Sequence, residues 1–218
     1  MIDNEQIILL RTVKRKDFPQ LKAAIKAAYP RWQGAPWHDR YLNILLDKFP
    51  EGQLCIEVNG VVVGAAFSLV VDYSKFGDNH TYAEITDNDN FGTHDPDGDV
   101  LYGIEIFVHP DYRGLRLGRR LYDARKELCR QYNFQAILAG GRIPSYHNYQ
   151  DEMSPMDYIQ KVDTKEIYDP ILSFQLSNDF QVTRLMHKYL PEDQKSLGYA
   201  TLLEWRNILY TPPSSVLN

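Results

Sequence analysis

The chain has 218 residues, of which 24 are basic and 29 acidic, so its formal net charge at pH 7 is −5. Apolar residues make up 44% of the sequence and aromatic residues 12%, a globular composition that excludes a chain disordered throughout. The negative net charge argues against general adhesion to nucleic acid or membranes, and no apolar stretch reaches the ~20 residues of a membrane span.

The first residues and the cysteines indicate a cytoplasmic protein. Asp3 and Glu5 precede any apolar run, which does not fit a secretory signal. Cys55 and Cys129 lie far apart, and two such cysteines are too few for a disulfide scaffold or a cysteine-based zinc site. We expect residues 1–210 to form a single domain and residues 211–218, which contain Pro-Pro-Ser-Ser, to form a tail or linker.

The first half of the chain predicts a strand, two helices and a β-hairpin. The strand covers residues 7–10, and the helices cover 18–28, with Asp17 as N-cap, and 38–49. The hairpin strands, 53–58 and 61–72, flank Asn59-Gly60. This dipeptide is typical of tight hairpin turns, because both central residues need positive φ.

The second half predicts a long loop followed by mixed strands and helices. Residues 75–98 are polar and acidic, so we predict a loop with a strand at 81–86. Further strands are expected at 100–108, at 134–139 with a break at Gly140-Gly141, and at 198–205; helices are expected at 118–132, 155–165 and 169–176. This order predicts an α/β or α+β protein.

Opposite charges gather in two adjacent segments. Residues 72–105 contain nine carboxylates and one lysine, whereas residues 111–130 contain seven Arg or Lys and three acids. The basic segment begins with a turn bearing Gly114 and Gly118, which leads from a buried strand into a helix. Glycines let the backbone approach a ligand, and a helix N-terminus presents unpaired N–H groups and a positive dipole end. The pattern suits a phosphate-rich group; a solvated basic helix is the structural alternative.

This strand, turn and helix resemble the acyl-CoA-binding motif of the GNAT N-acetyltransferase superfamily, Arg/Gln-x-x-Gly-x-Gly/Ala. Arg116 stands where that pattern prefers glycine. Five further stretches are similar to the acetyltransferase module that often accompanies a nitrilase-type amidase domain: 93–99, 121–128, 140–142, 172–176 and 189–193. The resemblance implies a GNAT-like, central, mixed but mostly antiparallel sheet flanked by helices, with a splayed motif strand.

The resemblance also implies a reaction and a cosubstrate. An acyl group, acetyl from acetyl-CoA, would pass to a primary amine by direct attack in a ternary complex, with no metal. The backbone amides of residues 115–119 would hold the CoA pyrophosphate, and the motif strand would pair with the pantetheine arm. The residues expected to bind CoA are Ile106, Phe107, Val108, Arg113, Gly114, Leu115, Arg116, Leu117, Gly118 and Arg119.

N-acetylation requires a base, because the amine must lose a proton from a group of pKa ~10. Glu105 is the only carboxylate in the motif strand and is our candidate; an ion pair with Arg113 is its structural alternative. Tyr102 could position a water, although strict alternation puts it on the opposite face from Glu105 unless a bulge intervenes. Members of the superfamily commonly use a tyrosine as the general acid that protonates the leaving thiolate. Gln175 stands at the aligned position here, so the resemblance implies no general acid.

The acidic segment is expected to attract a cationic acceptor. The residues expected to contact substrate are Glu84, His94, Asp99 and Arg142; Asp99 and Glu84 are also reserve bases. Residues 87–90 and 95–99 resemble fragments of calcium loops, but neither completes one.

Three functions remain open from the sequence. The first is an N-acyltransferase for a small-molecule or peptide amine, with a homodimer and a fused or partner nitrilase-type domain as assemblies to consider, and without nucleic acid or membrane partners. The second is a non-catalytic CoA-binding regulatory or interaction module of a larger amidase-type protein, suggested by Gln175 and by the tail. A calcium-stabilised structural domain ranks last.

Overall fold

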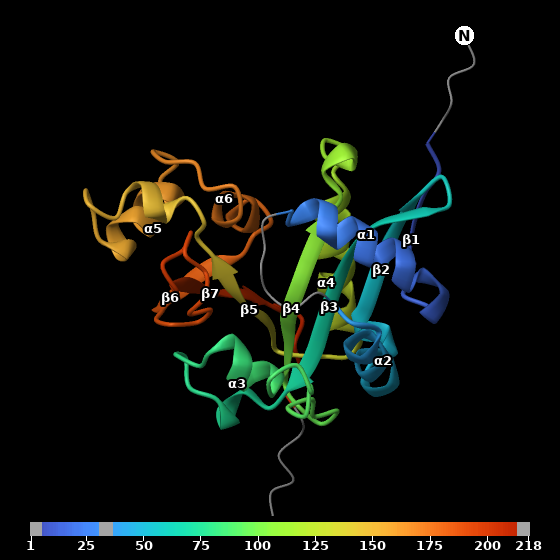
Figure 1. Ribbon diagram of the computed structural model, residues 1–218. Helices are drawn as coiled ribbons and strands as arrows, with labels where there is room; N and C mark the ends of the chain where they lie inside the picture. The colour runs from blue at the N-terminus through green and yellow to red at the C-terminus, as the bar shows by residue number, and fades with distance from the viewer. Residues whose placement is uncertain (1–5, 31–36, 213–218) are drawn as a thin grey trace, which may run out of the picture.

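A computed structural model describes residues 6–30 and 37–212, and its centre is a seven-stranded sheet of order β1-β2-β3-β4-β5-β7-β6 (Figure 1). Neighbouring strands in this order are antiparallel, except β4 and β5, which are parallel. The strands are β1 (Ile8–Thr12), β2 (Gln53–Val58), β3 (Val61–Val71), β4 (Val100–Val108), β5 (Ala136–Arg142), β6 (Gln181–Met186) and β7 (Ala200–Arg206). The expected mixed, mostly antiparallel sheet is confirmed.

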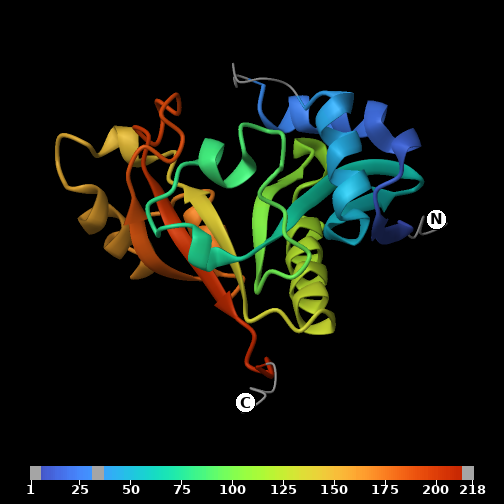
Figure 2. The same ribbon diagram turned by 90° about the horizontal axis from the view of Figure 1, so that it is seen from below.

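Helices cover both faces of this sheet, as the two orthogonal views show (Figures 1 and 2). One face carries α1 (Phe18–Ala28) and α2 (Asp39–Lys48). The other carries α4 (Leu117–Gln131), with α5 (Pro155–Asp163) and α6 (Leu172–Leu176) beside it. The short α3 (Tyr82–Thr86) lies near β6 and β7.

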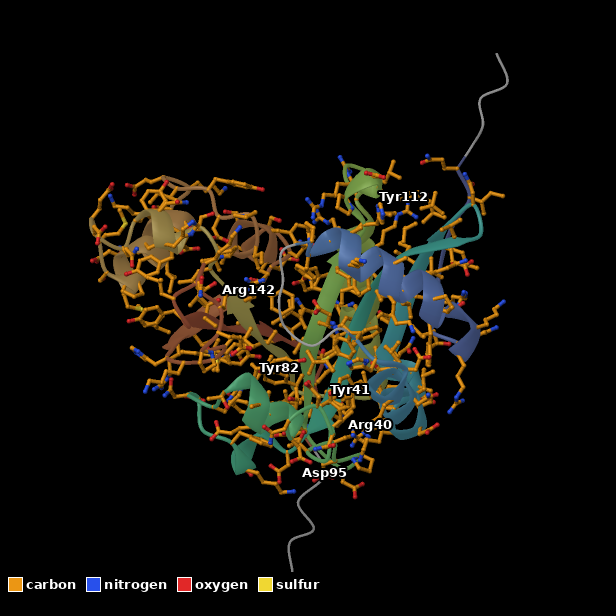
Figure 3. All side chains as sticks on the ribbon, in the orientation of Figure 1. Arg40, Tyr41, Tyr82, Asp95, Tyr112 and Arg142 are labelled. Carbon is orange, nitrogen blue, oxygen red and sulfur yellow. The ribbon has the colours of Figure 1, made fainter. Side chains whose placement is uncertain are left out.

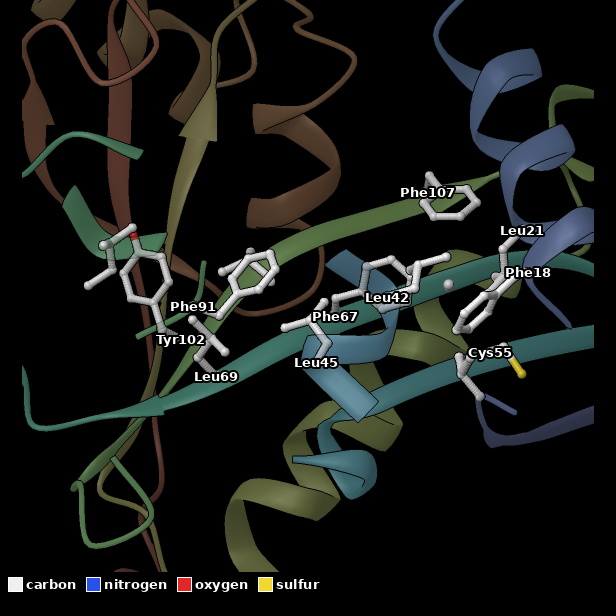
Figure 4. Packing of buried hydrophobic residues seen from close by; sticks show 14 of the residues in the cluster. Phe18, Leu21, Leu42, Leu45, Cys55, Phe67, Leu69, Phe91, Tyr102 and Phe107 are labelled. Atoms are coloured by element: carbon white, nitrogen blue, oxygen red, sulfur yellow. The ribbon is translucent and has the colours of Figure 1, made fainter. Parts of the chain in front are cut away.

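Two apolar layers hold the helices to the sheet. On the first face, α1 and α2 bring Phe18, Leu21, Leu42 and Leu45 against the aromatic residues Phe67 and Phe107 of β3 and β4 (Figure 4). On the second face, Leu128 of α4 packs with Leu101 and Ile137. Each fully buried leucine or phenylalanine contributes about 1.5–3 kcal/mol. Because side chains alternate along β4, they pack into two cores, one on each face of the sheet.

A bulge in β4 changes that alternation next to the candidate base. Phe67 of β3 pairs with Glu105, whereas Ser68 pairs with Gly103, so Ile104 is the extra residue. The extra residue reverses the alternation. Tyr102, in the α1 and α2 layer, and Glu105, hydrogen-bonded to the end of α1, therefore lie on the same face.

A buried arginine supports the bulge from the opposite face. Arg125 of α4 is only 2% exposed, and its Nη2 donates to the carbonyl oxygens of Phe67 at 3.0 Å and Glu105 at 2.8 Å. Gly103 makes room for it, since an added Cβ would lie 2.7 Å from Nη1 of Arg125. The guanidinium thus satisfies two carbonyls at the position where the ladder is irregular.

The strand predicted at 81–86 is wrong, because these residues form α3. The hydroxyl of Thr81 accepts from the backbone nitrogen of Glu84 at 3.1 Å, and the Glu84 carboxylate accepts from the backbone nitrogen of Thr81 at 2.7 Å. This reciprocal pair is a capping box, which starts a helix. Glu84, expected at the substrate, therefore holds a helix N-terminus and is exposed.

The break predicted at Gly140-Gly141 is also wrong, since β5 continues through both glycines to Arg142. A Cβ at Gly140 would overlap the Tyr189 ring, and one at Gly141 would lie 2.5 Å from Leu203. The glycines are therefore explained by close packing.

Two smaller differences concern β6 and Asp17. The strand β6 was not predicted. Asp17 precedes α1 as expected, but its side chain makes no capping bond; it is buried and accepts from the Arg11 guanidinium and the Lys14 backbone nitrogen instead. The other predicted helices and strands are confirmed to within a few residues at their ends. Of the tail, residues 213–218 lie outside the described part of the chain.

Candidate active site

The strands β4 and β5 pair only along their first halves. The parallel register runs from Val100 with Ala136 to Gly103 with Ala139 and ends there. Beyond that point β4 continues beside β3, and β5 continues beside β7 to Arg142. Strands that part leave N–H and C=O groups along their facing edges, where an extended ligand can pair with them.

The turn before α4 adopts a left-handed backbone that exposes the helix N-terminus. Gly114 has φ +89° with nothing within 4 Å of an added Cβ, and Arg116, the N-cap residue, has φ +57°. The Arg120 backbone nitrogen bonds to the Arg116 carbonyl oxygen at 3.2 Å, so the amides of residues 117–119 precede that bond. Tyr112, in the segment leading into this turn, marks its place in Figure 3. Such an N-terminus, with arginines around it, is suited to phosphate.

The left-handed conformation of Arg116 gives a physical reason for the glycine preferred at this position. A non-glycine residue in that region costs about 1–2 kcal/mol. We therefore expect Arg116→Gly to raise the melting temperature by about 2–4 °C, corresponding to roughly 1 kcal/mol in a chain of this size. Thermal unfolding followed by circular dichroism measures this. Arg113→Gly is the matched control, because Arg113 has φ −67° and should gain nothing; equal melting temperatures for the two variants would contradict the assignment of strain.

Glu105 lies in β4, just beyond the point where β4 leaves β5. Its Oε1 accepts from the Ile106 backbone nitrogen at 3.0 Å and from the Tyr29 hydroxyl, at the end of α1, at 3.1 Å. Burial raises the pKa of Glu105, while these hydrogen bonds, one from Trp37 and the Arg142 charge act in the opposite direction. The ion pair with Arg113, the structural alternative to a catalytic role, is not among those of the described residues. A carboxylate with a raised pKa is a stronger base.

The side of the site toward β5 contains a cation and two further hydroxyls. Arg142, at the end of β5, pairs with buried Asp193 through Nε at 2.6 Å and Nη2 at 2.7 Å. The pKa values of Tyr82 and Tyr189 are raised, mainly by burial and also by the Glu105 charge. Figure 3 shows Arg142 and Tyr82 on this side. The charges of Glu105 and Arg142 influence each other's pKa, so the two side chains lie on the same side of the site; the substrate role of Arg142 stays a prediction.

A fourth buried tyrosine, Tyr122, lies on the opposite face of the sheet. Tyr122 of α4 is buried, and burial raises the pKa of its hydroxyl. The charge of Arg125 and a hydrogen bond with Gln175 lower this pKa, whereas the charge of Glu105 raises it. Gln175 stands where the superfamily commonly has its general-acid tyrosine. It therefore lies beside the hydroxyl of a different tyrosine, Tyr122.

Two residues expected at the substrate lie at the start of β4, away from Glu105. His94 accepts from the Val70 backbone nitrogen through Nδ1 at 3.2 Å. Asp99 accepts from the Tyr73 backbone nitrogen at 3.2 Å. Because Asp99 precedes β4 by one residue while Glu105 follows the bulge, we do not include His94 or Asp99 in the proposed site. Both stabilise the loop that the acidic segment forms.

Other kinds of site have little support in residues 6–30 and 37–212. No group of three or more His, Cys, Asp or Glu there could hold a metal ion. Within the same residues, no helix has the length and apolar character needed to cross a membrane. Cys55 and Cys129 are both free and buried.

Comparison of the sequence with known proteins identifies the family. Residues 18–153 match the model of the acetyltransferase (GNAT) family. The protein named "Probable hydrolase YhcX" of Bacillus subtilis (strain 168) is 43% identical over 208 residues, which cover 95% of this chain and 40% of that protein. The chain thus spans less than half the length of this relative. "Uncharacterized N-acetyltransferase YkwB" of the same organism is 37% identical over 178 residues, 82% of this chain and 78% of the relative.

Solved structures show the same fold at low sequence identity. The loading GNATL domain of CurA from Lyngbya majuscula superimposes with a TM-score of 0.78 at 22% identity, covering 92% of this chain and 98% of that one. The GphF GNAT-like decarboxylase, in complex with isobutyryl-CoA, gives 0.76 at 18% identity, covering 91% and 98%. The splayed strands, the turn before α4 and the family match agree: this chain belongs to the acetyltransferase (GNAT) family.

Proposed function

We propose that the protein transfers an acyl group, acetyl in the first instance, from acyl-CoA to a primary amine. The observation that carries the proposal is the juxtaposition of the β4–β5 gap with Glu105, a carboxylate whose pKa burial raises. The name of the relative YkwB supports N-acetyl transfer, and solved structures of the same fold contain acetyl-CoA or CoA.

The described residues fit a CoA thioester at both of its ends. The amides of residues 117–119, with Arg113, Arg116 and Arg119 around them, would hold the pyrophosphate. The edge of β4 at residues 106–108 would pair with the pantetheine arm, and an amide there would stabilise the oxyanion that develops on the thioester carbonyl. Leu117 is 2% exposed and packs in the core, so it would contribute its backbone only.

Proton transfers are assigned to groups on the two faces of the sheet. Glu105 would remove a proton from the ammonium form of the acceptor, since only a neutral amine attacks. The hydroxyl of Tyr122, kept protonated by burial, would supply the proton that the leaving thiolate takes up. Trp37, Tyr29 and Tyr82 surround the carboxylate, and such aromatic walls favour a cationic small molecule or peptide amine.

We also propose that the module works with a hydrolase domain. The support is the relative YhcX, of which this chain covers 40% and whose name is that of a probable hydrolase. The nitrilase type of that domain, suggested by the sequence motifs, is part of this proposal.

Calorimetric titration with acetyl-CoA, followed by assays of thiol release with a panel of amines, tests the function. We expect binding, and release of free CoA with at least one of spermidine, tryptamine, L-lysine and a peptide with a free N-terminus. Binding without thiol release for any amine would favour the non-catalytic CoA-binding module. Absence of binding at millimolar acetyl-CoA would overturn both functions.

A further inference from the structure

Three buried side chains from distant segments form a continuous hydrogen-bonded chain beside the site. The Tyr102 hydroxyl lies 2.8 Å from Nε2 of His80 and 3.1 Å from the Tyr189 hydroxyl. His80 Nδ1 lies 2.8 Å from the carbonyl oxygen of Gly77. His80 is 4%, Tyr102 0% and Tyr189 3% exposed. The Tyr102 hydroxyl, which we expected to position a water, is thus engaged by two titratable neighbours.

The partners at each end fix the direction of these hydrogen bonds. A carbonyl oxygen only accepts, so His80 Nδ1 carries the hydrogen in its bond to Gly77. Burial lowers the pKa of His80, so at neutral pH its Nε2 accepts from Tyr102. Tyr102 then accepts from Tyr189, which in turn forms a hydrogen bond with the backbone of Gly140. The hydroxyl hydrogens therefore point toward His80.

The inner end of the chain lies where β4 and β5 part. Their register ends at Gly103 and Ala139, and Gly140 is the next residue of β5. The close packing of Tyr189 on Gly140 puts the Tyr189 ring at this point, where its pKa responds to the charge of Glu105. Tyr189 is therefore next to the place proposed for the thioester and the amine.

The outer end of the chain lies at a surface pocket. His80 is only 4% exposed but lines this pocket together with Lys75, Phe76, Gly77, Asn79 and Glu84. The charges of Glu84 and Asp78 face the imidazole and favour its protonated form. The rings of Tyr73, Phe76, Tyr102 and Tyr189 pack around it.

N-acylation has a proton to export. An ammonium ion and acetyl-CoA give an amide, CoA thiol and one free proton: two protons leave the nitrogen, and one of them ends on the thiol sulfur. We propose that Tyr189, Tyr102 and His80 relay the other proton from the site to the pocket, an inference that rests on the proposed N-acyl transfer. Tyr189 takes the proton while passing its own to Tyr102, and Tyr102 passes its own to His80 Nε2. The imidazolium then releases its Nδ1 proton to water in the pocket as its hydrogen bond to the Gly77 carbonyl opens. Return of the imidazole to the Nδ1–H tautomer and of the two hydroxyls to their starting orientation completes the cycle.

Chemical rescue in the 218-residue chain tests the relay. With acetyl-CoA and the amine that the wild type uses best, we expect Tyr102→Phe and His80→Ala to lower kcat about 10²-fold, the lower end of proton-transfer contributions. The Kd for acetyl-CoA should stay unchanged in both. Added imidazole should restore much of the activity of His80→Ala through the open pocket, and substituted imidazoles should restore it according to their basicity. A purely structural histidine would show no such dependence.

Tyr73→Phe is the matched control. It removes a buried hydroxyl beside His80 that has no hydrogen-bond partner among the described residues, and kcat should not change. His80→Asn, which can still donate to Gly77 but cannot accept and pass on a proton, covers the case in which His80→Ala does not fold. An active wild type with unchanged kcat in Tyr102→Phe or His80→Asn overturns the relay alone. Absence of thiol release by the wild type overturns the proposed function as well.

Discussion

Replacing Glu105 by glutamine should lower kcat for acetyl transfer by about 10²–10⁴-fold, the usual contribution of a general base. Glutamine keeps the size of the side chain and its hydrogen bonds to Tyr29 and Ile106 but cannot take a proton. The Kd for acetyl-CoA should be unchanged, because the carboxylate acts on the amine. Steady-state thiol release and calorimetry measure the two quantities. Glu152→Gln, which removes an exposed carboxylate near α5, is the control and should behave as wild type.

The pH dependence of the wild type and of Glu105→Gln tests the role of Glu105 independently. Because burial raises the pKa of Glu105 above its ordinary 4.5, wild-type kcat should fall as pH decreases through that raised pKa. A carboxyl group whose pKa is higher in the folded than in the unfolded chain costs stability as pH rises from the lower value through the higher one. Glu105→Gln should therefore melt at or above the wild-type temperature at pH 8. A large loss of stability with unchanged kcat would show a structural role and contradict the assignment.

The second large effect is expected from Arg125→Met. Removal of the guanidinium leaves the carbonyls of Phe67 and Glu105 buried without their donor, at about 1–3 kcal/mol each, partly offset because a charge is no longer buried. We expect a net loss of about 2–4 kcal/mol and a melting temperature lower by roughly 5–15 °C. At temperatures where the variant is folded, kcat should fall too, since the bulge keeps Glu105 on the face of the proposed acceptor site.

Arg206→Met serves as the matched control for this stability effect. Its side chain is 79% exposed and pairs with Glu204 at the surface, so the melting temperature should change little. If Arg125→Met and Arg206→Met unfolded at the same temperature, Arg125 would not support the bulge.

Local signals in the sequence predicted the framework of the site well. Asn59-Gly60 marks the hairpin, and both residues have positive φ in the structure. The glycine and arginine pattern before α4 predicted a helix N-terminus after a turn, and the structure has a turn there with positive φ at Gly114 and Arg116. Such patterns can be recognised in a sequence because each depends on the conformation of a few neighbouring residues.

Tertiary contacts account for what the sequence could not predict. Tyr29 and Trp37 hydrogen-bond to Glu105 and its charge acts on Tyr82, but the three aromatic residues come from separate segments. A single aromatic residue has no signature that distinguishes a site wall from a core. The bulge that puts Tyr102 and Glu105 on one face depends on pairing with β3. Sequence spacing showed only that a bulge was required.

Many of the opposite charges of residues 72–105 and 111–130 take part in contacts within the fold. Within the basic segment, Arg125 and Lys126 are buried and hold the structure, so the arginines at the helix start are the ones left for the proposed phosphate site. Within the acidic segment, Asp72 and Asp95 pair with Lys75, and Asp95 lies far from Arg142 (Figure 3). Burial, which decides between these roles, cannot be read from a count of charges.

A crystal structure of the acetyl-CoA complex would show whether the start of α4 and the gap between β4 and β5 bind the cosubstrate. We expect pyrophosphate oxygens about 3 Å from the backbone nitrogens of residues 117–119, the normal hydrogen-bond distance. We also expect the thioester in the gap between β4 and β5, on the side of Glu105. Acetyl-CoA bound elsewhere on the sheet, with the amides at the start of α4 free of phosphate, would contradict the proposed site.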